Sequence, residues 1–298
     1  MDSTRRTCRS LVLALAISGL FPWPAVAHPG SGIVVDRQGR IYFLDTGAGL
    51  WRIDTQGTLT RIPGPNFHWM TLDAHDAFRT APLPSGSGWE ITRVGGAPAF
   101  LLSSDFPIVM GPDGTLYFPS QGAGTLRILR QRPSERSSPF ATLPPTTAKG
   151  PLRWVNGLAI GSDGSLYYTE DDAIRRVSPQ GHVSAVVTDL ALAGCASIPG
   201  TEGPYLRGLA VDSLGSVYVA ASGCGRLLKV TPEGHVSTVI QVQSPWSPTA
   251  VTVFSGDLIV LEYLHTAAED RRAWVPRVRT ISPNGTSAVI ATVDRPGP

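Results

Sequence analysis

The chain has 298 residues, of which 42% are hydrophobic and 16% are charged. This composition is typical of a globular protein, and the length allows one large domain with a buried core. The formal net charge is only +2, so no broad basic surface indicates a nucleic acid or an anionic membrane as a partner.

Residues 1–27 have the three parts of a secretory signal peptide. Three arginines make the first nine residues basic, and residues 11–20 are apolar but too few to cross a bilayer. An Ala-Val-Ala sequence then ends at Ala27, after which we expect cleavage. Cleavage removes three arginines and one aspartate, which brings the formal charge from +2 to 0. We therefore expect an exported protein, secreted or periplasmic, in which residues 28–298 form one monomeric domain without a membrane span.

One pattern recurs through the rest of the chain: an apolar run, a polar turn with glycine, and a second run of strand-forming residues. The clear copies begin at Gly32, Phe106, Asn156, Arg207 and Thr249, and a weaker copy begins at His68. Six units of roughly 40–50 residues with no helical period predict a repeat architecture.

The number of strands in each unit can be counted in the copy from Asn156. Four runs of strand-forming residues alternate with turns there, at 158–160, 166–169, 173–177 and 183–187. The sequence therefore predicts an all-β fold, a six-bladed β-propeller of four-stranded antiparallel blades. An open solenoid and two sandwiches are the alternatives, but the unit is too long for the first and too regular for the second.

The phase of the repeats predicts how the propeller closes. The chain starts with the first strand of a blade and ends with a fourth strand, at 288–293. No terminal strand is left over to complete a blade at the other end. We therefore expect closure by packing between the first and the last blade.

Two cysteines, Cys195 and Cys224, remain after the signal peptide. An even number of cysteines in an oxidising compartment predicts a disulfide between them. Two buried free thiols are the alternative.

The copy from Asn156, NGLAIGSDGSLYYTE, resembles the Asn-Gly-Leu, Asp-Gly and Leu-Tyr motif of the senescence-marker-protein/gluconolactonase propellers. The repeat is also similar to NHL repeats. At the level of the repeat, the resemblance covers essentially all of the mature chain. It implies hydrolysis of a lactone in the central channel, with Asn156 as a ligand of a divalent metal such as calcium or zinc. The family's carboxylates would fall near Ser31 and at Arg207, where this chain has none, so its residues disfavour a metal.

Two sets of positions should surround the channel, because each repeat contributes one residue to each set. The first set holds the residues eight positions before the turn glycine, or their nearest equivalents in the less regular copies: Ser31, His68, Phe106, Asn156, Arg207 and Thr249. The second set lies where the second strands end: Asp45, Ser120, Glu170, Ala221 and Glu262. Polar residues gather in both sets, so we look for a site there.

Three residues of these sets are candidates for catalysis. His68 could act as a base near neutral pH, and Arg207 could bind a carboxylate or stabilise an oxyanion. Glu262 could serve as a general acid or base. The alternatives are a structural histidine and carboxylates that pair with Arg207 or cap loops.

The remaining candidates would bind the substrate. Aromatic walls around a few polar groups are typical of a small-molecule pocket. The expected polar residues are Asn156, Thr249 and Glu170, and the expected aromatic residues are Trp154, Tyr205 and Trp246. For the aromatic residues, packing between blades is the alternative.

Two functions of different classes follow from this sequence. The first is a hydrolase that acts in the channel on a small polar or lactone-type metabolite. The second is a non-catalytic NHL-type propeller that binds a protein or glycan. Convergence of His68, Asn156, Arg207 and a glutamate at one channel mouth would favour the enzyme.

Overall fold

The computed structural model describes residues 32–45, 49–62, 69–72, 78–79, 100–103, 107–122, 125–133, 135–145, 155–170, 172–195, 203–264 and 274–294. The predicted signal peptide lies outside these residues. Among the described residues, no helix has the length and apolar character needed to cross a membrane.

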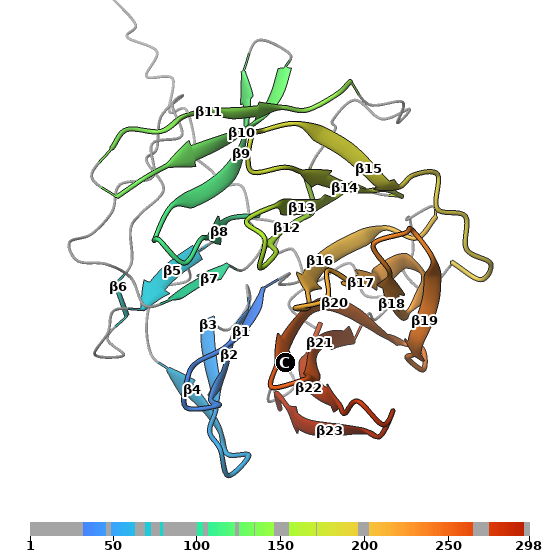
Figure 1. Cartoon of the computed structure of the whole chain (residues 1–298). Coiled ribbons are helices and arrows are strands. Elements are labelled where there is room, and N and C mark those ends of the chain that lie inside the picture. Colours follow the sequence, from blue (N-terminus) through green and yellow to red (C-terminus); the bar gives the residue numbers. More distant parts are fainter. Residues whose placement is uncertain are drawn as a thin grey trace, which may run out of the picture.

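Five antiparallel sheets of four strands are arranged around a common centre as blades of a propeller (Figure 1). The first is made of β1 (Ile33–Val35), β2 (Ile41–Asp45), β3 (Gly49–Ile53) and β4 (Leu59–Ile62), and the second of β8 (Val109–Met110), β9 (Leu116–Gly122), β10 (Thr125–Gln131) and β11 (Ser138–Thr142). The third is made of β12 (Gly157–Ile160), β13 (Leu166–Thr169), β14 (Ile174–Val177) and β15 (Val183–Val187). The fourth is made of β16 (Leu206–Val211), β17 (Val217–Ala221), β18 (Arg226–Val230) and β19 (Val236–Gln241), and the last of β20 (Trp246–Phe254), β21 (Asp257–Leu264), β22 (Pro276–Ile281) and β23 (Ser287–Thr292). All-β architecture and four-stranded antiparallel blades are thus confirmed.

The predicted number of six such blades is wrong, because the described residues form five four-stranded blades. The weak copy forms a three-stranded sheet of β5 (Trp69–Leu72), β6 (Phe78–Arg79) and β7 (Phe100–Ser103), in the order β6-β5-β7. Residues 80–99, which separate β6 from β7, contain three prolines and four glycines. Both residue types are uncommon inside strands, so the sequence of this copy lacks the regular strand pattern of the others.

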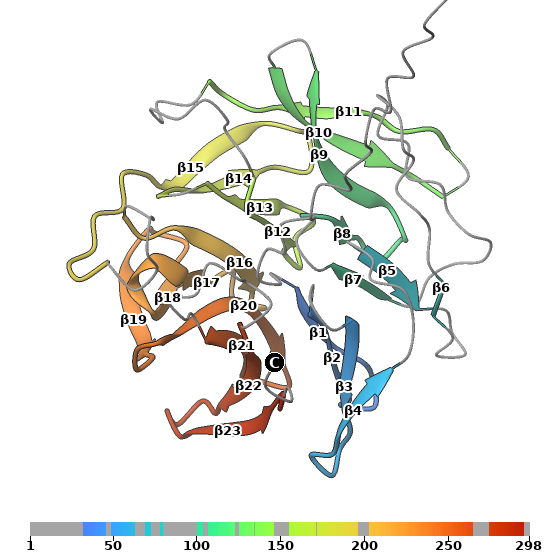
Figure 2. The same cartoon turned by 180° about the vertical axis from the view of Figure 1, so that it is seen from behind.

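The first strands of the blades lie around the centre. β8 contacts β12, β12 contacts β16, β16 contacts β20, and β20 contacts β1. Between β1 and β8 lies β7, which contacts both of them, as the two opposite views show (Figures 1 and 2). In the weak copy the strand next to the centre is therefore β7 and not β5, the strand that follows His68.

Packing between the first and the last blade closes the propeller, as the repeat phase predicts. Each of these two sheets takes all four described strands from its own end of the chain. Ile33 and Phe43 pack with Leu261 and Tyr263 in one buried cluster. The hydroxyl of Tyr263 also donates a hydrogen bond to the carbonyl oxygen of Leu44, at 3.5 Å.

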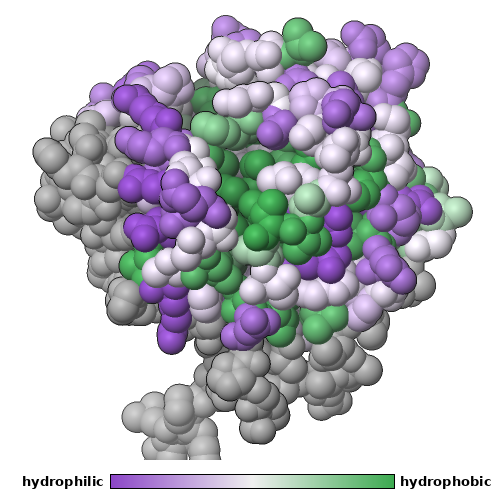
Figure 3. All heavy atoms as spheres, turned by 90° about the horizontal axis from the view of Figure 1, so that it is seen from below, coloured by the Kyte–Doolittle hydropathy of each residue, from purple (hydrophilic) through white to green (hydrophobic). Residues whose placement is uncertain are grey.

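Viewed from below, hydrophobic side chains gather in the middle of the face, with hydrophilic ones around them (Figure 3).

An aspartate stabilises the turn between the first two strands in each of four blades. In one turn, Oδ1 of Asp212 accepts the backbone N–H of Ser216 at 2.8 Å, and Gly215 has a φ of 81°. In another, the backbone N–H of Thr115 donates to Asp113 and lowers the pKa of its carboxyl group. This local chemistry explains why an aspartate and a glycine recur in these turns, although the aspartate stands three residues before the glycine in two turns and directly before it in the other two.

The predicted disulfide is confirmed. Cys195 and Cys224 are bonded across a sequence separation of 29 residues. Cys224 is in η1 (Ser222–Cys224), a short 3-10 helix after β17. The hydroxyl of Ser222 donates to the carbonyl oxygen of Pro248 in β20, so the bonded turn also contacts the last blade.

Gly157 is needed because β12 and β16 approach closely. A Cβ atom at this position would lie 2.5 Å from the carbonyl oxygen of Arg207 and 2.9 Å from Cδ2 of Leu209. Gly157→Ala is therefore expected to lower the free energy of unfolding by about 1–3 kcal/mol through overpacking, as measured by urea denaturation. Gly111→Ala is the control, since the nearest atom there is a side-chain oxygen of Asp113 at 3.0 Å, which can move. Equal losses in both variants would contradict the account.

Candidate functional site

A cavity of about 580 Å³ lies at the centre of the propeller. Its walls come from β1, β8, β12, β16 and β20 and from turns next to them. Most of the lining side chains are aliphatic, among them Ile33, Val109, Leu158, Leu209 and Val251. Arg37, Asn156 and Thr252 are the described lining residues with polar side chains. Although most of the lining side chains are aliphatic, the accessible lining of the cavity is somewhat more polar than apolar.

Asn156 lies at the start of β12, where two neighbouring blades meet. Its backbone N–H donates to the carbonyl oxygen of Thr169 at 2.9 Å. Its side-chain Nδ2 donates to the carbonyl oxygen of Leu206 at 3.0 Å. The amide group therefore links the third blade to the fourth while the residue lines the cavity.

Arg207 lies beside this position, in a β-bulge of β16. The pairing register with β17 shifts between Leu206 and Leu209, and bulges of this kind often lie next to active sites. Arg207 is 6% exposed, and its guanidinium carbon is 5.9 Å from the ring centre of Tyr205. Its carbonyl oxygen accepts the hydroxyl of Thr169 at 2.8 Å. Gly208, the next residue, lines the cavity, whereas Arg207 is not among its lining residues.

The two predicted carboxylates are buried in ion pairs within their own blades. Glu170 is 8% exposed and accepts a bond from Nε of Arg175 at 3.3 Å. Glu262 is 0% exposed and accepts bonds from Nε of Arg277 at 2.5 Å and Nε of Arg279 at 2.6 Å. Glu170 thus pairs with Arg175 of β14, and Glu262 pairs with Arg277 and Arg279 of β22.

The other predicted binding residues are placed as follows. Thr249 is fully buried in β20, and its hydroxyl donates to the carbonyl oxygen of Leu261 at 3.5 Å. Trp246 lies under Arg277, with the guanidinium carbon 3.9 Å from the ring centre. His68, Trp154, Ser31 and Phe106 lie outside the described residues.

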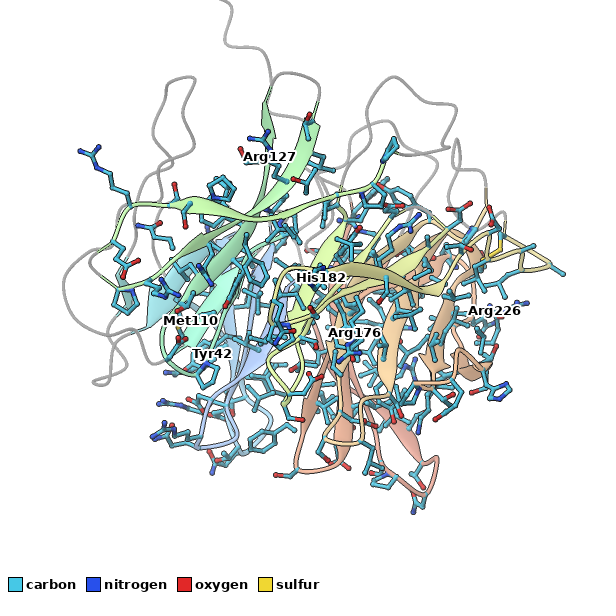
Figure 4. All side chains as sticks on the ribbon, turned by 45° about the horizontal axis from the view of Figure 1, so that its top comes forward. Tyr42, Met110, Arg127, Arg176, His182 and Arg226 are labelled. Carbon is cyan, nitrogen blue, oxygen red and sulfur yellow. A yellow bond between two sulfur atoms is a disulfide. The ribbon has the colours of Figure 1, made fainter. Side chains whose placement is uncertain are left out.

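Two further histidines are on exposed turns between the third and fourth strands of their blades. His182 follows β14, and His235 follows β18. Figure 4 labels His182 together with Arg127, Arg176, Arg226, Tyr42 and Met110. The structure therefore brings neither of these two histidines to the central cavity.

Sequence reasoning missed two features of the site. The aliphatic lining of the channel was not predicted, although the apolar first strand of each copy carried that signal. The pair Arg277 and Arg279 was also missed, although two arginines two residues apart in a strand lie on the same face. Both features depend on which side chains face each other in the folded protein.

The described residues do not fit the metal site that the resemblance implies. Asn156 offers one amide oxygen, and the nearby Arg207 is a cation that would repel a metal ion. A hard divalent cation needs several carboxylate or carbonyl oxygens. Within the described ranges, no group of three His, Cys, Asp or Glu side chains could hold a metal ion. We therefore derive no step through a metal.

No family model and no curated protein matches the chain. A solved structure of a putative gluconolactonase is similar, with 16% identity and a TM-score of 0.54 over 91% of this chain and 92% of the other. Regucalcin, a calcium-binding protein from Agrobacterium tumefaciens, has 14% identity and a TM-score of 0.53 over 82% and 86%. Virginiamycin B lyase from Staphylococcus aureus has 15% identity and a TM-score of 0.50 over 88% and 83%. At these identities, the likeness shows the β-propeller fold alone.

Proposed function

We propose that the chain is an exported β-propeller that binds a small polar or lactone-type molecule at the mouth of its central channel and hydrolyses it. The observation that carries the proposal is the cavity of about 580 Å³, which has Asn156 on its lining. The backbone of Arg207 lies next to Gly157, the residue that follows Asn156. The size of the cavity suits a small ligand, and a few polar groups on a mostly aliphatic wall can orient one. The name of the gluconolactonase neighbour makes lactones the first substrates to assay.

The roles of the polar residues follow from their chemistry. The guanidinium of Arg207 would stabilise the oxyanion that forms when water attacks the carbonyl carbon of the lactone. A general base would accept the proton of that water and return it to the ring oxygen as the carbon–oxygen bond breaks. His68 is the base predicted from the sequence, although it precedes β5, which is not the strand next to the centre. Asn156, with Thr249 and the aromatic residue Tyr205, would position the substrate. The buried Glu170 would support the mouth through its ion pair with Arg175.

Export is the other part of the proposal. The leader of residues 1–27 supports it, and so does the disulfide between Cys195 and Cys224, since such bonds persist in oxidising compartments. The mature protein would be secreted or periplasmic, and a monomer.

The test is a panel of lactones and esters, assayed on the mature protein with and without a chelator. Arg207→Ala is expected to lower kcat/KM by about 100-fold, as loss of an oxyanion donor does in other hydrolases. Asn156→Ala is expected to raise KM. Arg127→Ala, which removes an exposed arginine of β10, is the control and should leave both constants unchanged.

Two outcomes would contradict the proposal. Activity that is unchanged in Asn156→Ala and Arg207→Ala would place the chemistry elsewhere. Activity that disappears with the chelator would require a metal, against the donor set described above.

A non-catalytic propeller that binds a protein or glycan is the second candidate. The aliphatic channel lining and the engagement of Glu170 and Glu262 by arginines favour it, because neither feature provides a carboxylate for acid–base chemistry. A folded mature protein that hydrolyses no member of the panel would support this candidate.

A further inference from the structure

A second pocket lies between the fourth and the last blade, away from the channel. It has a volume of about 370 Å³. One wall is the segment 240–246, which connects β19 to β20, and the other wall is formed by Arg277 and Arg279 of β22. We call it the inter-blade pocket. None of its lining residues lines the central cavity.

The two arginines are held in place from behind by one carboxylate. Glu262 is fully buried, and each arginine donates its Nε–H to one of its oxygens. The arginine side chains are 14% and 15% exposed. In the described part of the chain, their hydrogen bonds use Nε alone, so the terminal Nη groups remain for a ligand. Two positive charges and one negative charge leave the cluster with a net charge of +1.

The walls of the pocket complete a binding site for an organic molecule. The ring of Trp246 stacks on Arg277 at 3.9 Å, which fixes the plane of this guanidinium. Pro245 and Ile240 add apolar surface, and the exposed Gln243 offers an amide group. The site therefore combines a pre-positioned cation with an apolar wall.

We propose that the inter-blade pocket binds a small organic molecule through its carboxylate group. A guanidinium presents parallel N–H donors that match the two oxygens of a carboxylate. One uncompensated positive charge matches a single carboxylate, and Trp246 and Pro245 match an apolar or ring-shaped body. This inference does not rest on the proposed hydrolase function, because it uses a different pocket and different residues.

The test is isothermal titration of the mature protein with benzoate and with gluconate as carboxylate probes. Benzyl alcohol is the neutral counterpart, and inorganic phosphate is the competing oxyanion. At least one carboxylate should bind with 1:1 stoichiometry, more weakly as salt rises, and benzyl alcohol should not bind. Arg279→Gln is expected to weaken binding at least about tenfold, because it removes the uncompensated charge.

A second variant leaves the buried cluster intact, in case Arg279→Gln does not fold. Gln243→Glu adds a negative charge at the exposed rim of the pocket and should weaken carboxylate binding about fivefold to tenfold. Gln180→Glu makes the same charge change on an exposed turn of the third blade and should have no effect. With benzoate as the probe, Asn156→Ala should also have no effect, which separates this site from the channel.

Several results would overturn the proposal. The first is that neither carboxylate binds up to its solubility limit. The second is that phosphate binds more tightly than both carboxylates, or that benzyl alcohol binds as tightly as they do. The third is that Gln243→Glu and Gln180→Glu change the affinity for the carboxylate by the same factor. Loss of binding in Asn156→Ala would place the carboxylate in the channel instead.

Discussion

Glu262→Ala is expected to lower the free energy of unfolding by about 3–5 kcal/mol. The carboxylate is fully buried and is the shared hydrogen-bond acceptor of Arg277 and Arg279. Removing it leaves two mostly buried guanidinium groups without their counter-ion, and an uncompensated buried charge costs far more than the pair itself contributes. Urea denaturation at neutral pH, followed by far-UV circular dichroism, measures the loss.

Glu135→Ala is the matched control for this prediction. It also removes a glutamate paired with an arginine, Arg132, but those side chains are 58% and 50% exposed. Water already solvates both charges there, so the expected loss is below about 1 kcal/mol. A loss of that size in Glu262→Ala as well would show that Glu262 does not hold the two arginines in the folded protein.

Replacing Cys195 and Cys224 together by alanine is expected to lower the free energy of unfolding by about 3–4 kcal/mol. The bond closes a segment of 29 residues, and its loss gives the unfolded chain more conformational freedom. Denaturation of the oxidised wild type and of the double variant measures the difference. We expect the loss to appear as a lower urea midpoint.

A reducing agent provides the control for the disulfide. Dithiothreitol should lower the stability of the wild type to about that of the double variant and should leave the double variant unchanged. A double variant as stable as the oxidised wild type would show that the bond does not constrain the unfolded chain. If reduced wild type were instead much less stable than the double variant, the buried thiols themselves would be responsible.

The sequence was sufficient for the features that depend on local chemistry. The turn at Asp212 and Gly215 needs an acceptor for a backbone N–H and a residue that tolerates a positive φ, and both needs are visible in the residues themselves. The composition of the strands then predicted blades of four strands. The phase of the repeats predicted that the propeller closes by packing between the first and the last blade, with no strand from one end of the chain completing a blade at the other end. The pairing of Cys195 with Cys224 followed because no other cysteine remained in the predicted mature chain.

The number of blades failed for a reason that is also physical. The weak copy was aligned through the short run after His68, but the strand that reaches the centre of the propeller is β7, about thirty residues later in the chain. The prolines and glycines between β6 and β7 remove the regular alternation on which such an alignment depends. A repeat can therefore be recognised in a sequence without its strand order being known.

The sequence alone determined that this protein is a β-propeller of four-stranded blades with a disulfide. The blades follow from residues near one another in the chain, and the disulfide follows because only two cysteines remain after the predicted signal peptide. Only the tertiary structure decided which side chains meet. The bulges in β16 and β20 shift the strict alternation of faces, so counting along the strand could not show that Gly208 lines the cavity and that Arg207 does not. Glu262 was expected at the channel mouth, whereas the structure places its carboxylate between Arg277 and Arg279. Contacts of this kind depend on how the sheets pack, and that information is spread over the whole chain.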